Sequence, residues 1–142
     1  MHPNLLIALC IVLWGVWGLS SKLSNVHNAP VFVTLATNVL YALLSIPLLW
    51  KLKEDATPIN WSLSAISWIV LTGVVGVSAK LIFNQALSKE PASIVIPATS
   101  IFPIVTVVLA VLFLKEKITM VQGAGMLLCV AGVYLVTSGR EC

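Results

Sequence analysis

Residues 63–87 read LSAISWIVLTGVVGVSAKLIFNQAL, a run in which Lys80 is the one charged side chain. A helix needs roughly 20 mainly apolar residues to cross the ~30 Å hydrocarbon core of a bilayer, so this run is long enough. Transmembrane strands are shorter and alternate apolar with polar residues, which this run does not. The stretch therefore predicts a membrane-spanning helix.

Four more stretches of similar length lack acidic and basic residues, and each is bounded by charged or turn-forming residues. These stretches are residues 3–21, 30–50, 92–114 and 118–138. Because unsatisfied backbone groups are costly in lipid, we expect all five to be helices. The sequence predicts an all-α polytopic transmembrane bundle of five spans, in one domain over residues 5–138.

The composition favours the same class of protein. Hydrophobic residues make up 59% of the chain and charged residues 9%, whereas soluble domains carry roughly 25% charged residues. The net charge of +3 is spread over hydrophobic stretches, so no dense basic patch is present to bind nucleic acid. We expect an integral multi-pass protein of the plasma (inner) membrane, with the lipid bilayer as its surroundings and no nucleic-acid partner.

The connections between spans suggest how the chain crosses the membrane. Residues 88–91 and 115–117 are short, so the third, fourth and fifth spans are predicted to be antiparallel neighbours in sequence order. Residues 51–62 form the one loop that is aqueous throughout, with Asp55 and Pro58 in it. Five spans put four lysines on one side, and Lys22, Lys89 and Arg140 on the other. This weakly favours a cytoplasmic N-terminus and leaves insertion in both orientations open.

Polar residues within the second and third stretches recur at helical spacing. Thr34, Asn38, Tyr41 and Ser45 share one face of the second, and Lys80 and Asn84 share one face of the third. Thr and Ser often bond to their own helix, so they are weak indications of a site. Asn38 and Asn84 are stronger, because a carboxamide needs a partner on another helix. For Trp14 and Tyr41, stacking on a substrate and packing inside the bundle both stay open.

Lys80 lies about 10 Å from the Leu87 end of its helix at 1.5 Å per residue. Its stem is long enough to carry the ammonium towards the membrane surface. Alternatively, the ammonium is a cationic site for an anionic or carboxylate-bearing substrate, or an amine that exchanges protons. Both interpretations stay open on the sequence.

Pro97 and Pro103 interrupt the fourth stretch on either side of Thr99 and Ser100. Each proline lacks the N–H that would bond to a carbonyl one turn earlier, and lipid offers that carbonyl no other donor. Such broken helices line a cavity or pack against other protein.

Acidic residues occur only in loops and at helix ends, at Glu54, Asp55, Glu90, Glu116 and Glu141. No span therefore has the carboxylate that would bind a cationic drug and a proton in turn. No cluster has metal-ligand spacing, no nucleophile has a base on a neighbouring span, and no glycine-rich phosphate loop is present. We predict no enzymatic activity, no metal and no cofactor.

Two regions of the chain carry a family resemblance. One runs from Glu90–Pro97 through Ser100–Pro103 to Leu114–Thr119, followed by Gln122, Gly125 and Gly132–Val133, and the other is Leu13–Trp14–Gly15 with Lys22. Together they resemble the EamA domain, the repeat unit of the drug/metabolite transporter superfamily, over almost the whole chain. The resemblance implies that this chain is one half of an inverted-repeat transporter, because family members usually contain two such five-helix repeats.

The resemblance also implies where a substrate would bind, in a cavity between two repeats lined by the first four helices. The residues of this chain that would line it are Trp14, Asn38, Tyr41, Lys80, Asn84 and Ser100, with Pro97 and Pro103 as helix-breaking residues. Glu116 corresponds to a family acid, which we interpret as a structural cap or loop partner. Lys80 is not part of the general family pattern.

The sequence thus predicts a transporter that moves a small polar metabolite by alternating access. It would work as a dimer, either an antiparallel homodimer or a pair with a related half-size chain. A non-transporting membrane subunit and a subunit of a lipid-linked sugar flippase are the alternatives.

Overall fold

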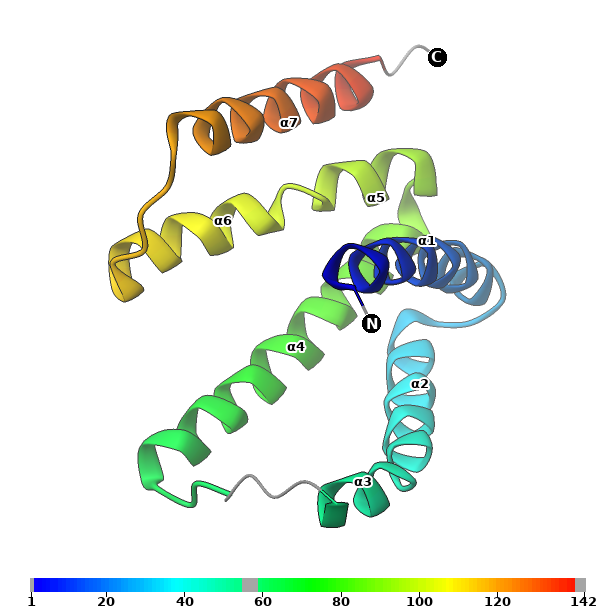
Figure 1. Ribbon diagram of the computed structural model, residues 1–142. Coiled ribbons are helices and arrows are strands. Elements are labelled where there is room, and N and C mark those ends of the chain that lie inside the picture. The colour runs from blue at the N-terminus through cyan, green and yellow to red at the C-terminus, as the bar shows by residue number, and fades with distance from the viewer. Residues whose placement is uncertain (1, 55–58, 140–142) are drawn as a thin grey trace. The chain divides into compact units, whose positions relative to one another are not determined.

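The computed structural model describes residues 2–54 and 59–139, and every regular element in these ranges is a helix (Figure 1). The predicted all-α class is therefore confirmed. The chain divides after Lys89 into two compact units, residues 1–89 and 90–142. Asp55 and Pro58 of the predicted aqueous loop, and Arg140 of the charge balance, lie outside the described residues.

The first unit contains α1 (Pro3–His27), α2 (Pro30–Ser45), α3 (Leu48–Glu54) and α4 (Leu63–Lys89). Helix α4 packs against both α1 and α2, and α1 also contacts α2. Helices α1 and α2 each begin with a proline, whose missing N–H costs nothing in the first turn. This three-helix contact is the part of the unit on which its polar residues converge.

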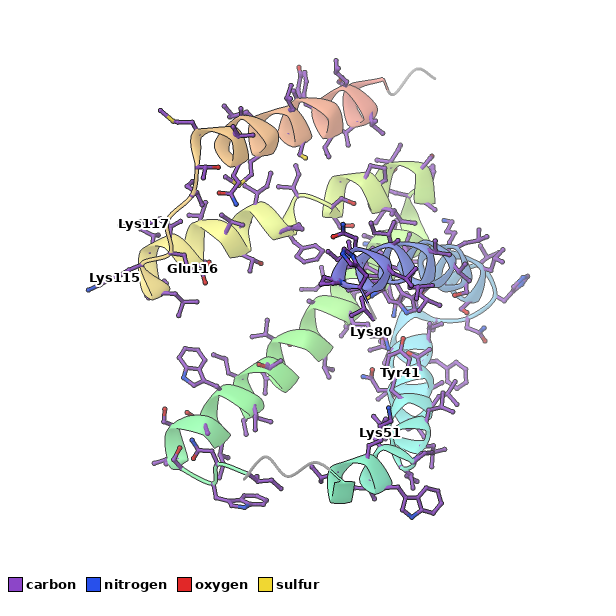
Figure 2. All side chains as sticks on the ribbon, in the orientation of Figure 1. Tyr41, Lys51, Lys80, Lys115, Glu116 and Lys117 are labelled. Carbon is purple, nitrogen blue, oxygen red and sulfur yellow. The ribbon has the colours of Figure 1, made fainter. Side chains whose placement is uncertain are left out.

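The second unit contains α5 (Ala92–Thr99), α6 (Phe102–Leu109), the π-helical turn η1 (Ala110–Leu114) and α7 (Met120–Ser138). Lys115 ends η1 in a left-handed conformation, with φ of 56°. Thr119 and Gln122 then form a reciprocal capping box that starts α7. Helix α7 returns along α6 to contact α5, so the predicted hairpin at residues 115–117 is confirmed (Figure 1). Figure 2 shows Lys115, Glu116 and Lys117 together at this turn.

The predicted span over residues 30–50 is broken at Pro47. Pro47 has no N–H to donate to the carbonyl of Leu43, and the N–H of Ile46 bonds to that carbonyl instead, at 3.2 Å. Helix α2 ends at Ser45, and α3 starts afresh at Leu48. The sequence reading followed charge and did not anticipate this break, and whether residues 30–50 form one span stays a prediction.

The predicted span over residues 92–114 is also interrupted, between Thr99 and Phe102. Pro103 cannot donate to the carbonyl of Thr99, so the helix cannot continue with regular bonds through this point. The N–H of Ser100 is shared between the carbonyls of Ile96 and Pro97, at 3.1 and 3.0 Å, which closes α5 with a tighter turn. The sequence anticipated an interruption here from its two prolines.

Four helical stretches are long and apolar enough to cross a membrane: Pro3–His27, Leu63–Lys89, Ala92–Leu114 and Met120–Ser138. Helix α2 has 16 residues and is about 24 Å long at 1.5 Å per residue, short of a ~30 Å core. The four stretches make the chain a multi-pass membrane protein. A fifth crossing by α2 and α3 stays a prediction.

Most apolar side chains of the described residues point outwards. The buried apolar ones are Val33, Leu87 and Val95, whereas leucines, isoleucines and valines are exposed along all the helices except α5. A soluble protein would hide such surface from water, but lipid solvates it without cost. The buried positions of the first unit are instead largely polar, which is the reverse of a soluble core.

Labelling of single cysteines can decide whether α2 and α3 cross the bilayer. With Cys10, Cys129 and Cys142 replaced by alanine, Asn28→Cys and Ile59→Cys place one thiol before α2 and one after α3. Five spans require the two thiols to react with an impermeant maleimide from opposite sides of the membrane. Labelling of both from the same side would contradict the fifth span.

Candidate functional site

Polar side chains of the first unit lie at intervals of four residues on three helices. Residues at this interval stand one above another on a helix face. The three rows are Trp17, Ser21 and Asn25 on α1, Thr34 and Asn38 on α2, and Lys80 and Asn84 on α4. Because α4 contacts α1 and α2, the rows meet and form two layers about one helical turn apart.

The amide layer consists of Asn25, Asn84 and Thr34. The Nδ2 of Asn25 donates to the Oδ1 of Asn84 at 3.0 Å, and the Nδ2 of Asn84 donates to the Oγ1 of Thr34 at 2.8 Å. The three side chains are 6%, 1% and 4% exposed, so the bonds are shielded from lipid and water alike. One chain of hydrogen bonds thus joins α1, α4 and α2.

The hydrogen bond that Thr34 donates fixes which atoms donate and which accept in the rest of the amide layer. The hydroxyl of Thr34 donates to the carbonyl of Pro30 at 2.8 Å, so its oxygen must accept from Asn84. The amide oxygen of Asn84 must then face Asn25, which donates to it and also to the carbonyl of Ser21, at 2.8 Å. The Oδ1 of Asn25 is left buried without a hydrogen-bond partner in the described part of the chain.

The cation layer consists of Lys80, Asn38, Tyr41 and Trp17. The Nζ of Lys80 donates to the Oδ1 of Asn38 at 3.0 Å and lies 3.9 Å from the centre of the Tyr41 ring. The indole N–H of Trp17 donates to the hydroxyl oxygen of Tyr41 at 2.8 Å. Trp17 is in turn stacked on Phe83, with ring centres 5.3 Å apart. Figure 2 shows Lys80 and Tyr41 on the facing sides of α4 and α2.

A cavity of about 190 Å³ lies beside the cation layer. Its polar lining comes from all three helices: Trp17, Ser20, Ser21 and Ser24 of α1, Thr37 and Tyr41 of α2, and Lys80 and Asn84 of α4. The half-buried ammonium of Lys80 lies against α2 and contributes to the cavity wall. In this arrangement Lys80 does not extend along its own helix towards the membrane surface.

Lys22 has a different contact at the end of the same three helices. Its Nζ donates to the backbone carbonyl of Leu87 at 2.6 Å. Leu87 lies in the last turn of α4, where carbonyls have no partner within the helix and the helix dipole favours a cation. Lys22 therefore caps α4 from α1.

Four of the predicted substrate-binding residues, Asn38, Tyr41, Lys80 and Asn84, lie together in the two layers. Trp14 is 66% exposed and is not among the cavity-lining residues. Ser100 belongs to the second unit, where its hydroxyl donates to the carbonyl of Ile96 at 2.8 Å. A substrate-binding role for any of the six stays a prediction.

The two predicted helix-breaking prolines also lie in the second unit. Pro97 is inside α5, and Pro103 is in the first turn of α6. Whether they line a cavity stays a prediction.

The sequence reading missed Trp17 and Asn25 and gave Thr34 little weight. The signal was present, because Trp17, Ser21 and Asn25 repeat at four-residue spacing just as Thr34 and Asn38 do. Trp14 lies three residues before Trp17, so the two tryptophans are neighbours on α1 and helical spacing does not separate them. The bond of Trp17 to Tyr41 depends instead on the register between α1 and α2.

Potential metal ligands do not gather in residues 2–54 and 59–139, where no group of three His, Cys, Asp or Glu side chains could hold an ion. The chemistry that the described site offers is therefore that of one ammonium, one phenol, amides and hydroxyls. These groups can bind a polar solute.

Comparison with known proteins gives a match along the whole chain. The sequence model of the EamA-like transporter family matches residues 2–138. An uncharacterized protein of Methanocaldococcus jannaschii is 32% identical over 138 residues, which cover 96% of this chain and 98% of that protein. No solved structure matches the chain.

Replacement of Asn84 tests the amide layer. Asn84→Ala removes both cross-helix bonds, so we expect the free energy of unfolding in detergent to fall by about 1–3 kcal/mol. The control is Ser78→Ala on the same helix, since Ser78 is exposed and its hydroxyl bonds only to its own helix at Val74. Equal stability of the two variants would show that the amide layer does not hold the helices together.

Proposed function

The chain belongs to the EamA-like transporter family, and from this premise we propose that it moves a small polar metabolite across the membrane by alternating access. The family is one of transporters, and we propose no catalytic activity for this member. Its four long apolar helices make it an integral multi-pass membrane protein. We place it in the plasma membrane as part of the same proposal.

The observation that carries the proposal is the position of Lys80. A charged residue within a membrane helix is costly to keep, and such residues typically line pathways for ions or solutes. Lys80 lies near the last third of α4, and its ammonium reaches a cavity between three helices. Packing alone would be served better by an apolar side chain at this position.

The size of the cavity favours a partner for the chain. About 190 Å³ is below the roughly 300–1,000 Å³ of pockets that enclose a drug-sized ligand. An alternating-access transporter also needs a gate on each side of its site, which inverted repeats supply in pairs. We propose that a second copy in the opposite orientation, or a related half-size chain, supplies the other half.

The charge distribution is compatible with pairing of this kind. The two sides of a five-span chain carry nearly equal numbers of basic residues, so neither orientation is strongly preferred. Insertion of the same chain both ways would generate an antiparallel homodimer. A strongly oriented chain would need an oppositely oriented relative.

Replacing each of two lysines, Lys80 and Lys22, by alanine distinguishes an effect on transport from an effect on stability. We expect Lys80→Ala to reduce solute flux into proteoliposomes more than Lys22→Ala does, because only Lys80 lies at the cavity. Lys22→Ala should instead lower the thermal stability, through loss of its bond to the carbonyl of Leu87. Equal losses of flux in purified, reconstituted protein would contradict a substrate role for Lys80.

Dilution in lipid tests the need for a dimer. When the chain is reconstituted from a dissociating detergent at decreasing protein-to-lipid ratio, we expect flux per chain to fall as vesicles come to hold single chains. The control is a tandem fusion of two copies, in which five spans would place the second copy inverted. The fusion should keep its flux per copy on dilution, and constant flux from the unfused chain would contradict the dimer.

A further inference from the structure

Lys80 brings a positive charge to a cavity that, in the described part of the chain, no acid lines. The acids of residues 1–89 are Glu54 at the end of α3 and Asp55 after it. In the part of the chain that the structure describes, the ammonium contacts the amide oxygen of Asn38 and the ring of Tyr41. Both stabilise a cation, but neither carries the charge that would neutralise it.

Within the described residues, the ammonium of Lys80 also has hydrogens that no acceptor takes. It has three N–H donors, and Asn38 accepts one of them at 3.0 Å. In low-dielectric surroundings an ammonium of this kind favours an anion that can take the remaining donors.

Tyr41 adds a second donor next to the first. Its hydroxyl oxygen accepts the indole N–H of Trp17, so the hydroxyl hydrogen must point away from Trp17. Stacking on Phe83 holds the indole in this position. The ammonium lies over the face of the Tyr41 ring, 3.9 Å from its centre, and the hydroxyl is at the edge of that ring. Both side chains line the cavity, so one carboxylate can accept from the ammonium with one oxygen and from the hydroxyl with the other.

The remaining polar residues that line the cavity are uncharged, and most of them are serines and threonines. The hydroxyls of Ser20, Ser24 and Thr37 donate to carbonyls of their own helices, at 2.9, 2.9 and 2.6 Å. Their oxygens can still accept hydrogen bonds from a ligand's hydroxyl or amine. Among the residues that the structure describes, no acidic side chain lines the cavity to attract a cationic ligand.

We propose that this cavity binds the carboxylate group of a small organic monoanion, seated on the Nζ of Lys80 and the hydroxyl of Tyr41. The inference rests on the proposed transport function and names the substrate class of the same site. One ammonium balances one negative charge, whereas a phosphate group carries about 1.5 to 2. The cavity of about 190 Å³ within one chain has room for the carboxylate end of such a molecule.

Matched pairs of probes test the proposal on the purified full chain in lipid nanodiscs. The pairs are acetate and acetamide, lactate and lactamide, and benzoate and benzamide, with 1-aminopropan-2-ol as a cation of similar size to lactate. Binding is measured by the shift in melting temperature over a concentration series. We expect at least one carboxylate to bind about tenfold more tightly than its amide, as loss of a charge-assisted hydrogen bond would cost.

Variants tie this preference to Lys80. Lys80→Gln should abolish the preference for the carboxylate over its amide, while Lys80→Arg keeps it in part. Asn38→Asp is the safeguard if Lys80→Gln does not fold, because it leaves Lys80 in place and gives it a neighbouring carboxylate that competes with the ligand. Lys51→Gln is the control, since Lys51 is an exposed lysine on α3 (Figure 2).

The outcomes separate this inference from the proposed function. A carboxylate preference lost in Lys80→Gln and Asn38→Asp but kept in Lys51→Gln supports the inference. Equal binding of amides or of 1-aminopropan-2-ol, binding of chloride as tightly as the carboxylates, or no binding of any carboxylate overturns it. Flux of a neutral or cationic solute that depends on the chain would then leave the transport function standing, whereas absence of flux for all the probes would overturn both.

Discussion

A bilayer contains no water to hydrogen-bond a polar side chain, so polar groups within membrane helices must bond to one another. The first unit depends on this constraint. Asn84 of α4 can satisfy both ends of its amide only by contacting Asn25 of α1 and Thr34 of α2. These bonds fix the height of each helix relative to the other two. Because Lys80 and Asn38 are each one turn from an amide-layer residue on the same helix, the same register brings Lys80 to Asn38 and Tyr41.

The backbone obeys the same constraint at its prolines. Pro47 and Pro103 each deprive a carbonyl of its usual donor, and both stretches are interrupted within four residues of that carbonyl. At Pro47 the preceding N–H takes over the carbonyl of Leu43. Before Pro103, the hydroxyls of Thr99 and Ser100 both bond to the carbonyl of Ile96, so side chains as well as amides satisfy the last turn of α5. Breaks of this type occur where half-helices border a cavity or other protein, which is common in transporters built from repeats.

Apolar side chains are exposed and polar ones are buried in this protein because lipid, and not water, surrounds its helices. Leucine, isoleucine and valine lie on the outside, and asparagine, threonine and serine occupy buried positions of the first unit. In such a protein a polar core is what specifies the arrangement of helices, because apolar contacts with lipid are as favourable as apolar contacts with protein. A cation in that core is a cost that a purely structural unit would avoid. In the proposed transport function this cost has a reason, since a solute path needs polar groups that are not fully satisfied by the protein itself.

Sequence alone determined the class of this protein, its helices and its family resemblance, because length, hydropathy and prolines act locally along the chain. It also identified Lys80, Asn38, Tyr41 and Asn84, since an isolated polar residue in an apolar run is visible without any knowledge of its partners. The sequence reading did not anticipate the helix break before Leu48 or the part that Asn25 plays, although Pro47 and the four-residue spacing of Asn25 held that information. It could not choose between Trp14 and Trp17, because residues three apart are neighbours on a helix. Only the tertiary structure decided which helix supplies each partner, that Lys80 reaches α2, and that the Asn25 oxygen is left over. These depend on the register between helices, and register is set by hydrogen bonds between residues up to 65 positions apart, which no local pattern contains.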